Sequence, residues 1–151
     1  RAFLPARNAA KRGDFDAWAE TPAGSLALLI LLDQLSRNLF RGSAEAFAAD
    51  PKALSIAKSA IERGFDIGMT AVQRMFLYLP FEHAEDIAEQ DRSVELFEAL
   101  RLELGDNTVD YAERHRAVIR QFGRFPHRNL VLERPSTSEE MDFLLEPGSR
   151  F

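Results

Sequence analysis

Three histidines stand at positions where an imidazole could do chemistry. His83 lies in the stretch PFEHAED (residues 80–86), His115 lies on an apolar helical stripe, and His127 lies in FGRFPHRN (residues 122–129). An imidazole can accept or donate a proton near pH 7 and can also bind a metal ion. We select His83 and His127 as candidate catalytic acids or bases. We expect His115 to be buried and hydrogen-bonded within the chain.

The stretch FGRFPHRN concentrates cationic and hydrogen-bonding groups on a turn that also has to be partly buried. Gly123 ends the preceding helix, Phe125 anchors the turn in the core, and Pro126 stiffens it. A fixed backbone would hold the polar side chains of this turn as a rigid array. These side chains are Arg124, His127, Arg128 and Asn129.

A second polar cluster follows from the spacing in LLDQLSRNLFR (residues 31–41). Asp33 precedes Arg37 by four residues, which brings the two charges within reach of an ion pair on a helix. The alternative is a helix whose last turns simply reach solvent, where the helix dipole favours Arg. Four residues recur at i, i+3, i+4 and i+7 along one face of this otherwise apolar helix: Gln34, Arg37, Asn38 and Arg41.

Carboxylates crowd the third stretch, PFEHAED, around His83. The positive end of a helix dipole accounts for Glu85 and Asp86 at the start of the following helix. Glu82, which is adjacent to His83, joins the candidate ligand-binding residues.

The three stretches together predict a concave site for a small anionic molecule. Arg presents a planar fork of donors that suits a carboxylate or a phosphate. The alternative is that each Arg pairs with a protein carboxylate and joins helix ends, in which case its removal lowers stability. No cofactor is identified. The candidate ligand-binding residues are Asp33, Gln34, Arg37, Asn38, Arg41, Glu82, Arg124, Arg128 and Asn129.

A metal-assisted hydrolase is a second hypothesis. If the three histidines converge, they could bind Zn²⁺ or another divalent ion together with Glu82 or Asp86. Their spacing matches no metal motif, since neither H-E-x-x-H nor E-x-x-H occurs. We therefore assign no metal-ligating residue. Nucleophilic catalysis is less favoured still, because the chain has no Cys and no Ser in a strand-turn-helix elbow.

The elements that must position these residues are helices. Apolar residues recur at helical spacing between clear start and stop signals, with Asp50 as an N-cap before Pro51. No stretch shows the alternation of a β-strand. The predicted helices run from Thr21-Pro22 to Arg41-Gly42, from Asp50 to Gly64, from Val72 to a stop at Pro80, from Ile87 to near Gly105, from Tyr111 to Gly123, and from the Thr137 to Glu140 capping box to Pro147-Gly148.

The chain is therefore expected to be all-α. Its 151 residues suit one domain, residues 1–151, and the short connections favour an antiparallel helical bundle or stacked helical hairpins. The chain opens at Arg1 rather than at Met, which leaves open a missing N-terminal segment. The oligomeric state is not indicated.

Composition and charge narrow the partners. The net charge of −5 argues against nucleic acid, although residues 112–134 carry six Arg against two Glu, a local +4 that leaves −9 elsewhere. No apolar run approaches the length of a membrane span, so we expect no membrane insertion. The absence of Cys is compatible with a reducing cytoplasm, where we expect the protein to be located.

Five stretches in order resemble the bacterial family catalogued as domain of unknown function 924. They are LALLILLDQLSRNLFRG, AFAADPKAL, MFLYLPFEHAED, HRAVIRQFGRFPHRN and RPSTSEEMDFL. The resemblance implies a fold of tetratricopeptide-like helical hairpins and no established activity, which makes a protein-interaction scaffold a third hypothesis. Leu35-Ser36 stands where family members typically have Phe-Pro, and Ala84 where they have Ser, so neither position supports a shared hydroxyl chemistry. An upstream segment with Trp and Phe that is usual in the family is absent here.

Overall fold

The fold is a bundle of helices without strands, as the sequence predicts. The structure, a computed structural model, describes residues 1–151. None of the helices is long and apolar enough to span a bilayer. The helices are α1 (Leu4–Arg12), α2 (Pro22–Leu29), α3 (Leu35–Leu39), α4 (Asp50–Glu62), α5 (Ala71–Glu82), α6 (Ile87–Glu98), α7 (Arg101–Leu104), α8 (Asp106–Phe122) and α9 (Ser138–Leu144). Short 3₁₀ or π segments are η1 (Asp16–Glu20), η2 (Ile30–Gln34), η3 (Ala44–Ala46) and η4 (Pro126–Arg128).

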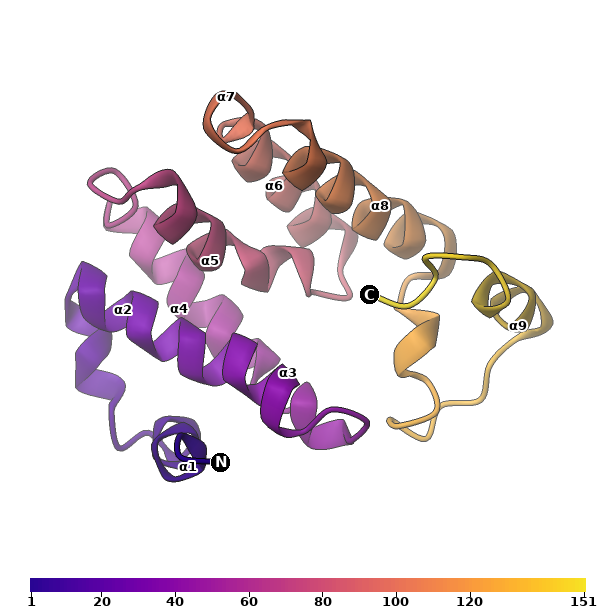
Figure 1. The fold of residues 1–151 in the computed structure, drawn as a ribbon, viewed down its shortest axis with the longest axis horizontal. Coiled ribbons are helices and arrows are strands. Elements are labelled where there is room, and N and C mark those ends of the chain that lie inside the picture. The colour runs from indigo at the N-terminus through magenta and orange to yellow at the C-terminus, as the bar shows by residue number, and fades with distance from the viewer.

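Two groups of helices pack around one apolar core. Helices α2 and α3 follow one another along one side with α4 beside them, while α6 and α8 lie side by side on the other, as Figure 1 shows. Helix α5 contacts both groups, and its Leu77, Tyr78 and Phe81 are buried in the main cluster. After α8 the chain turns back, and Phe151 packs with Phe125 in a smaller apolar cluster. The C-terminus therefore lies beside the end of α5 (Figure 1), and Phe151 lines the same space as Arg37 of α3 and Glu82 of α5.

The predicted helix from Thr21 to Gly42 is interrupted by a π segment. Thr21 caps it by accepting a hydrogen bond from the Gly24 amide, and Gly42 ends it with a left-handed φ of 80°. Between α2 and α3, segment η2 is wound as a π-helix, a local widening that is frequent at functional sites. Asp33 belongs to this segment and is buried there.

The prediction that Pro80 ends a helix is wrong. Helix α5 continues through Pro80 to Glu82, and both residues are buried. Proline removes one helical hydrogen bond, but the burial of this last turn in the core compensates for it. Glu82 and His83 therefore lie at the C-terminal end of α5, and not at the start of the next helix.

Two other boundary predictions need correction. Asp50 is not an N-cap, because Ala49 holds that position without a side-chain bond and the Asp50 carboxylate binds Arg37. The predicted helix from Ile87 to Gly105 is divided into α6 and α7. The Thr137 capping box with Glu140 is confirmed, and the left-handed Gly123 ends α8 as expected.

Gly24 is required where α2 crosses η1. A Cβ at this position would overlap the carbonyl group of Trp18, which is rigid backbone. A glycine in the first turn of a helix is otherwise slightly unfavourable relative to alanine. The close approach of α2 to η1 therefore explains why position 24 is a glycine.

We expect Gly24→Ala to lower the free energy of unfolding by roughly 1–3 kcal/mol, the usual cost of overpacking, instead of the gain that alanine gives in an open helix. Urea denaturation followed by circular dichroism measures it. Gly68→Ala is the matched control, since a Cβ there meets only open space. Equal stability of the two variants would show that η1 does not pack on α2 as described.

Candidate functional site

The predicted polar residues surround a cavity of about 610 Å³. It lies where the ends of α3 and α5 meet α8, η4 and the C-terminal Phe151. This volume suits a small-molecule ligand. Seven of the eleven candidate residues line it: Gln34, Arg37, Arg41, Glu82, His83, His127 and Arg128.

Asp33 lies behind the cavity wall and organises it. Its side chain is 1% exposed and accepts a hydrogen bond of 2.6 Å from Arg37 Nη1 and one of 3.2 Å from Gln34 Nε2. Burial acts to raise the pKa of Asp33, but His83 and Arg37 outweigh it, so the pKa is below its usual range. Asp33 is thus an ionised carboxylate at neutral pH.

His83 is oriented by Asp33. The His83 Nδ1 lies 2.8 Å from Asp33 Oδ1. Because an ionised carboxylate can only accept, Nδ1 carries the hydrogen and donates it. The other ring nitrogen, Nε2, has no hydrogen-bond partner in the protein, and the residue lines the cavity. An imidazole held this way can exchange a proton at Nε2 with a bound molecule.

Arg37 is a structural residue in this arrangement. Besides Asp33, it binds the Asp50 carboxylate with both arms of its fork, at 2.8 and 2.9 Å. Burial acts to lower the pKa of Arg37, but the two carboxylates raise it above its usual value. Its donors are therefore engaged by the protein, which is the alternative that the sequence left open. The i,i+4 pair of Asp33 and Arg37 is confirmed.

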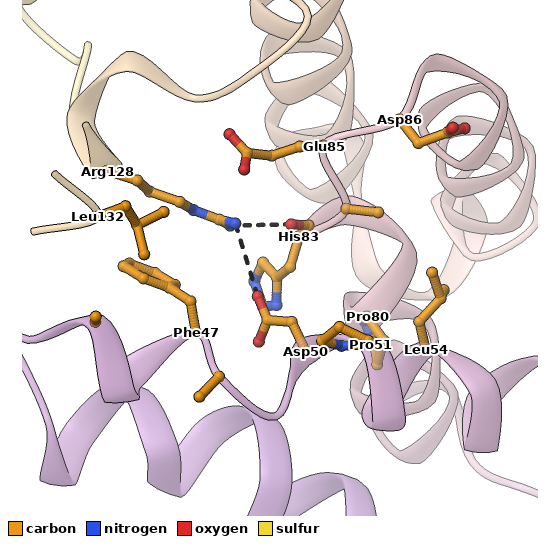
Figure 2. Close-up of a pocket in the computed structure, with 13 residues that line it drawn as sticks. Phe47, Asp50, Pro51, Leu54, Pro80, His83, Glu85, Asp86, Arg128 and Leu132 are labelled. Carbon is orange, nitrogen blue, oxygen red and sulfur yellow. Dashed lines mark hydrogen bonds and ion pairs between the residues drawn. The ribbon is translucent and has the colours of Figure 1, made fainter. Parts of the chain in front are cut away.

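Arg128 is held between two aromatic rings. Its guanidinium carbon lies 4.4 Å from the ring centre of Phe47 and 4.7 Å from that of Phe125. It donates to the main-chain oxygen of His83 at 2.9 Å and lies 3.7 Å from the Asp50 carboxylate, as Figure 2 shows. Its Nε has no partner, and burial lowers the pKa of Arg128 to about 10. The guanidinium is fixed but its donors are not all used.

Arg41 is different from both, because it has no partner. It lies at the exposed rim of the cavity, just after α3, and no carboxylate is within ion-pair distance. Its donors are available to a ligand.

Three other titratable groups of the cavity are uncharged at neutral pH. Burial, with a smaller contribution from the charge of Asp33, raises the pKa of Glu82 to about 8. Burial likewise lowers the pKa of His115 to about 3 and that of His127 to about 4. His115 is buried and its Nδ1 lies 2.8 Å from the Tyr111 carbonyl oxygen, so the prediction for this residue is confirmed. His127 Nδ1 has no partner.

Three candidate residues lie away from the cavity. Arg124 binds the Glu140 carboxylate at 2.8 and 2.7 Å, and Asn129 donates to Ser136 at 3.1 Å and to Glu140 at 3.3 Å. Both hold α9 against the turn after α8. Asn38 is exposed on α3 and does not line the cavity. Sequence spacing placed these residues on the right segments, but only packing determines their direction.

Several residues that build the site are not identifiable as such from the sequence. The sequence predicts Asp50 as a helix cap, and its position before Pro51 gives no sign of the bond to Arg37. Phe47 holds Arg128, and Phe151 stacks on His115 with ring centres 3.8 Å apart. Aromatic residues in loops give no signal of this kind. Glu85, whose position the sequence attributes to the helix dipole, binds Arg134 at 2.8 and 3.0 Å.

A second cavity of about 550 Å³ adjoins the first (Figure 2). The two share Phe47, His83 and Arg128 as a common wall. Much of its remaining lining is apolar, including Leu54 and Leu132, and its carboxylates are bound to protein groups. It extends the space beside His83 without adding free charge.

The arrangement of the histidines gives no support to a metal-assisted hydrolase. All three line the first cavity, but no group of three or more His, Cys, Asp or Glu side chains is placed to hold a metal ion. Ser36 offers no nucleophile either, because its buried hydroxyl accepts a hydrogen bond from Arg7 at 2.8 Å.

Fold and site together define an all-helical protein with a polar cavity at the ends of its helices. Residues 1–148 match the family described as "Bacterial protein of unknown function (DUF924)", and the chain belongs to this family. A solved structure of a protein of unknown function from Agrobacterium tumefaciens is 47% identical, with a TM-score of 0.87. The match covers 95% of this chain and 79% of that one. No curated protein gives a match.

We expect Arg37→Ala to lower the free energy of unfolding by about 3 kcal/mol, near the lower limit for breaking a buried ion pair, because His83 and Gln34 still bind Asp33. Equilibrium urea unfolding measures the loss. Arg41→Ala, which removes an unpaired Arg from the same helix end, should stay within about 0.5 kcal/mol of the parent. If both variants match the parent, Arg37 does not hold the segments together.

Glu82 should make stability depend on pH. Its pKa is about 8 in the folded protein and about 4.5 as an ordinary glutamate, so the folded state holds one more proton between these values. The contribution of Glu82 to the free energy of unfolding therefore falls as pH rises from 4.5 to 8, by up to about 1.4 kcal/mol per pH unit. Glu82→Gln removes this loss. The difference in free energy of unfolding between Glu82→Gln and the parent should therefore grow up to pH 8 and then level off.

Urea unfolding at several pH values from 5 to 9 tests this dependence. Glu139→Gln is the control, because it removes an exposed carboxyl from α9. Parallel curves for the parent and Glu82→Gln would contradict a buried, neutral Glu82.

Proposed function

We propose that the larger cavity binds a small molecule that carries a carboxylate or a phosphate. The observation that carries the proposal is Arg41, a guanidinium on the cavity wall that no protein carboxylate neutralises. A cation without a partner beside a cavity favours an anionic ligand.

The charge balance of the site supports the same conclusion. Three guanidinium groups, those of Arg37, Arg41 and Arg128, face two carboxylates, those of Asp33 and Asp50. The remaining carboxyl and two of the imidazoles are neutral at pH 7. A concave site with a net positive charge attracts anions more strongly than a flat surface of mixed charge does.

The ligand contacts follow from which donors are free. Arg41 supplies charge at the rim, and His127 lines the cavity as a neutral imidazole. Gln34 and Arg128 line the wall between them. Arg124 and Asn129 are not included, because their donors are bound to other protein groups.

His83 is the acid/base group of the proposal. The Asp33 carboxylate fixes its ring, and its Nε2 is left for the bound molecule. A carboxylate that orients an imidazole also stabilises its protonated form during proton transfer. The cavity is therefore a binding site with an oriented base. The scaffold hypothesis and the tetratricopeptide-like hairpins stay predictions.

Inorganic phosphate should raise the melting temperature of the parent chain, because it binds the folded state alone. At a phosphate concentration 100 times Kd, binding raises the free energy of unfolding by about 2.7 kcal/mol. In Arg41→Ala, phosphate should no longer raise the melting temperature. Without phosphate, the melting temperature of this variant should stay close to that of the parent. Differential scanning fluorimetry over a phosphate series measures both values.

Arg120→Ala is the matched control. It removes one equally charged, exposed residue from α8, where its only ion pair is a 3.8 Å contact with Asp91. It should keep the full phosphate response. Equal responses in the parent, Arg41→Ala and Arg120→Ala would show a general salt effect and would contradict the proposed site.

A further inference from the structure

Glu82 is a buried carboxyl group without a hydrogen-bond partner. Its side chain is 1% exposed, and no protein group donates to or accepts from it. Buried polar groups in folded proteins are almost always paired, so an unpaired one calls for a specific explanation. No ion pair explains it either, since the cations of the cavity are bound elsewhere or lie at the rim.

The surroundings of Glu82 keep it uncharged. It is the last residue of α5 and lines the larger cavity next to His83. From η2 it meets the negative charge of Asp33, which opposes a second carboxylate nearby. The other titratable groups that line the cavity are Tyr111 and His115 from α8, His127 and Arg128 from η4, and Arg37 and Arg41 from the end of α3.

An uncharged carboxyl group differs from a carboxylate in one useful way. It carries an O–H group, which can donate a hydrogen bond to an anion. Within an enclosed cavity such a bond is stronger than in water. The same oxygens would repel an anion if the proton were lost.

We propose that Glu82 is a carboxylic acid that donates its hydrogen to an oxygen of the anion bound in the cavity. This inference rests on the proposed function and deepens it. It assigns the ligand to the oxyanions, which offer an oxygen lone pair to the acid and a negative charge to Arg41. It also places a proton donor beside the oriented His83, so that one cavity holds both an acid and a base.

Sulfate is the probe that distinguishes a proton lost by the protein from a proton lost by the ligand. It has no proton to lose at or above neutral pH, so any change in its binding reports on the protein. Isothermal titration calorimetry with sulfate should be run from pH 7 to 9. This range ends below the pKa of Arg128, which is about 10, so Arg128 keeps its charge.

We expect the affinity of the parent for sulfate to fall by about tenfold per pH unit once the pH exceeds the pKa of Glu82, which is about 8. Glu82→Gln keeps an uncharged donor, so it should bind sulfate with an affinity that does not change over the same range. Glu82→Leu has no donor and should bind at least tenfold more weakly than the parent at pH 7. Affinities of the parent and Glu82→Gln that change with pH in the same way would overturn the proposal.

Infrared spectroscopy gives a second measurement that needs no ligand. The parent at pH 7 should show the carbonyl stretch of a protonated carboxyl group, and Glu82→Gln should lack it. Added sulfate should shift this band to lower frequency. Absence of the band would overturn the role of Glu82 even if sulfate binds. If the band is present but the parent does not bind sulfate, the proposed function fails. This inference then fails with it.

Discussion

The buried carboxylate of Asp33 sets the constraint from which the polar end of the bundle follows. A carboxylate removed from water is tolerated only when other groups supply hydrogen bonds and positive charge. Arg37, Gln34 and His83 do so. Arg37 also binds Asp50 at the start of α4. The ends of three helices, α3, α4 and α5, are thereby joined by charge. The π segment η2 holds Asp33 in place at the centre of this network.

The C-terminal segment is attached to this network by a second set of bonds. Arg128 reaches across to the His83 carbonyl and is clamped between Phe47 and Phe125, while Glu85 binds Arg134 and the Phe125 amide. The cavity is the space left between these connections. In the C-terminal segment, Arg124, Arg128 and Arg134 hold elements together. Arg41, which follows α3, has its donors free. The division between structural and available cations is what gives the cavity its positive character.

The neutral groups of the cavity matter as much as the charged ones. Burial makes Glu82 retain its proton and makes His115 and His127 give theirs up at neutral pH. Few charges therefore line the cavity, and a buried one such as that of Arg128 is poorly screened. An oriented His83 thus lines the same cavity as a protonated carboxyl group, so one space holds both an acid and a base. Such pairs are typical of sites for proton transfer.

Local signals in the sequence were sufficient for the helical class, for most helix ends and for the segments that carry the polar residues. Start and stop signals act over a few residues, so Thr21, Gly123 and the Thr137 capping box work as their types predict. The pair of Asp33 and Arg37 is likewise local to one helix. Only the tertiary structure decided that Pro80 stays inside a helix, that Asp50 binds Arg37 and that Arg124 turns to Glu140 while Arg41 stays free. Those outcomes depend on which distant group lies within hydrogen-bond reach, and spacing along one chain segment carries no information about it.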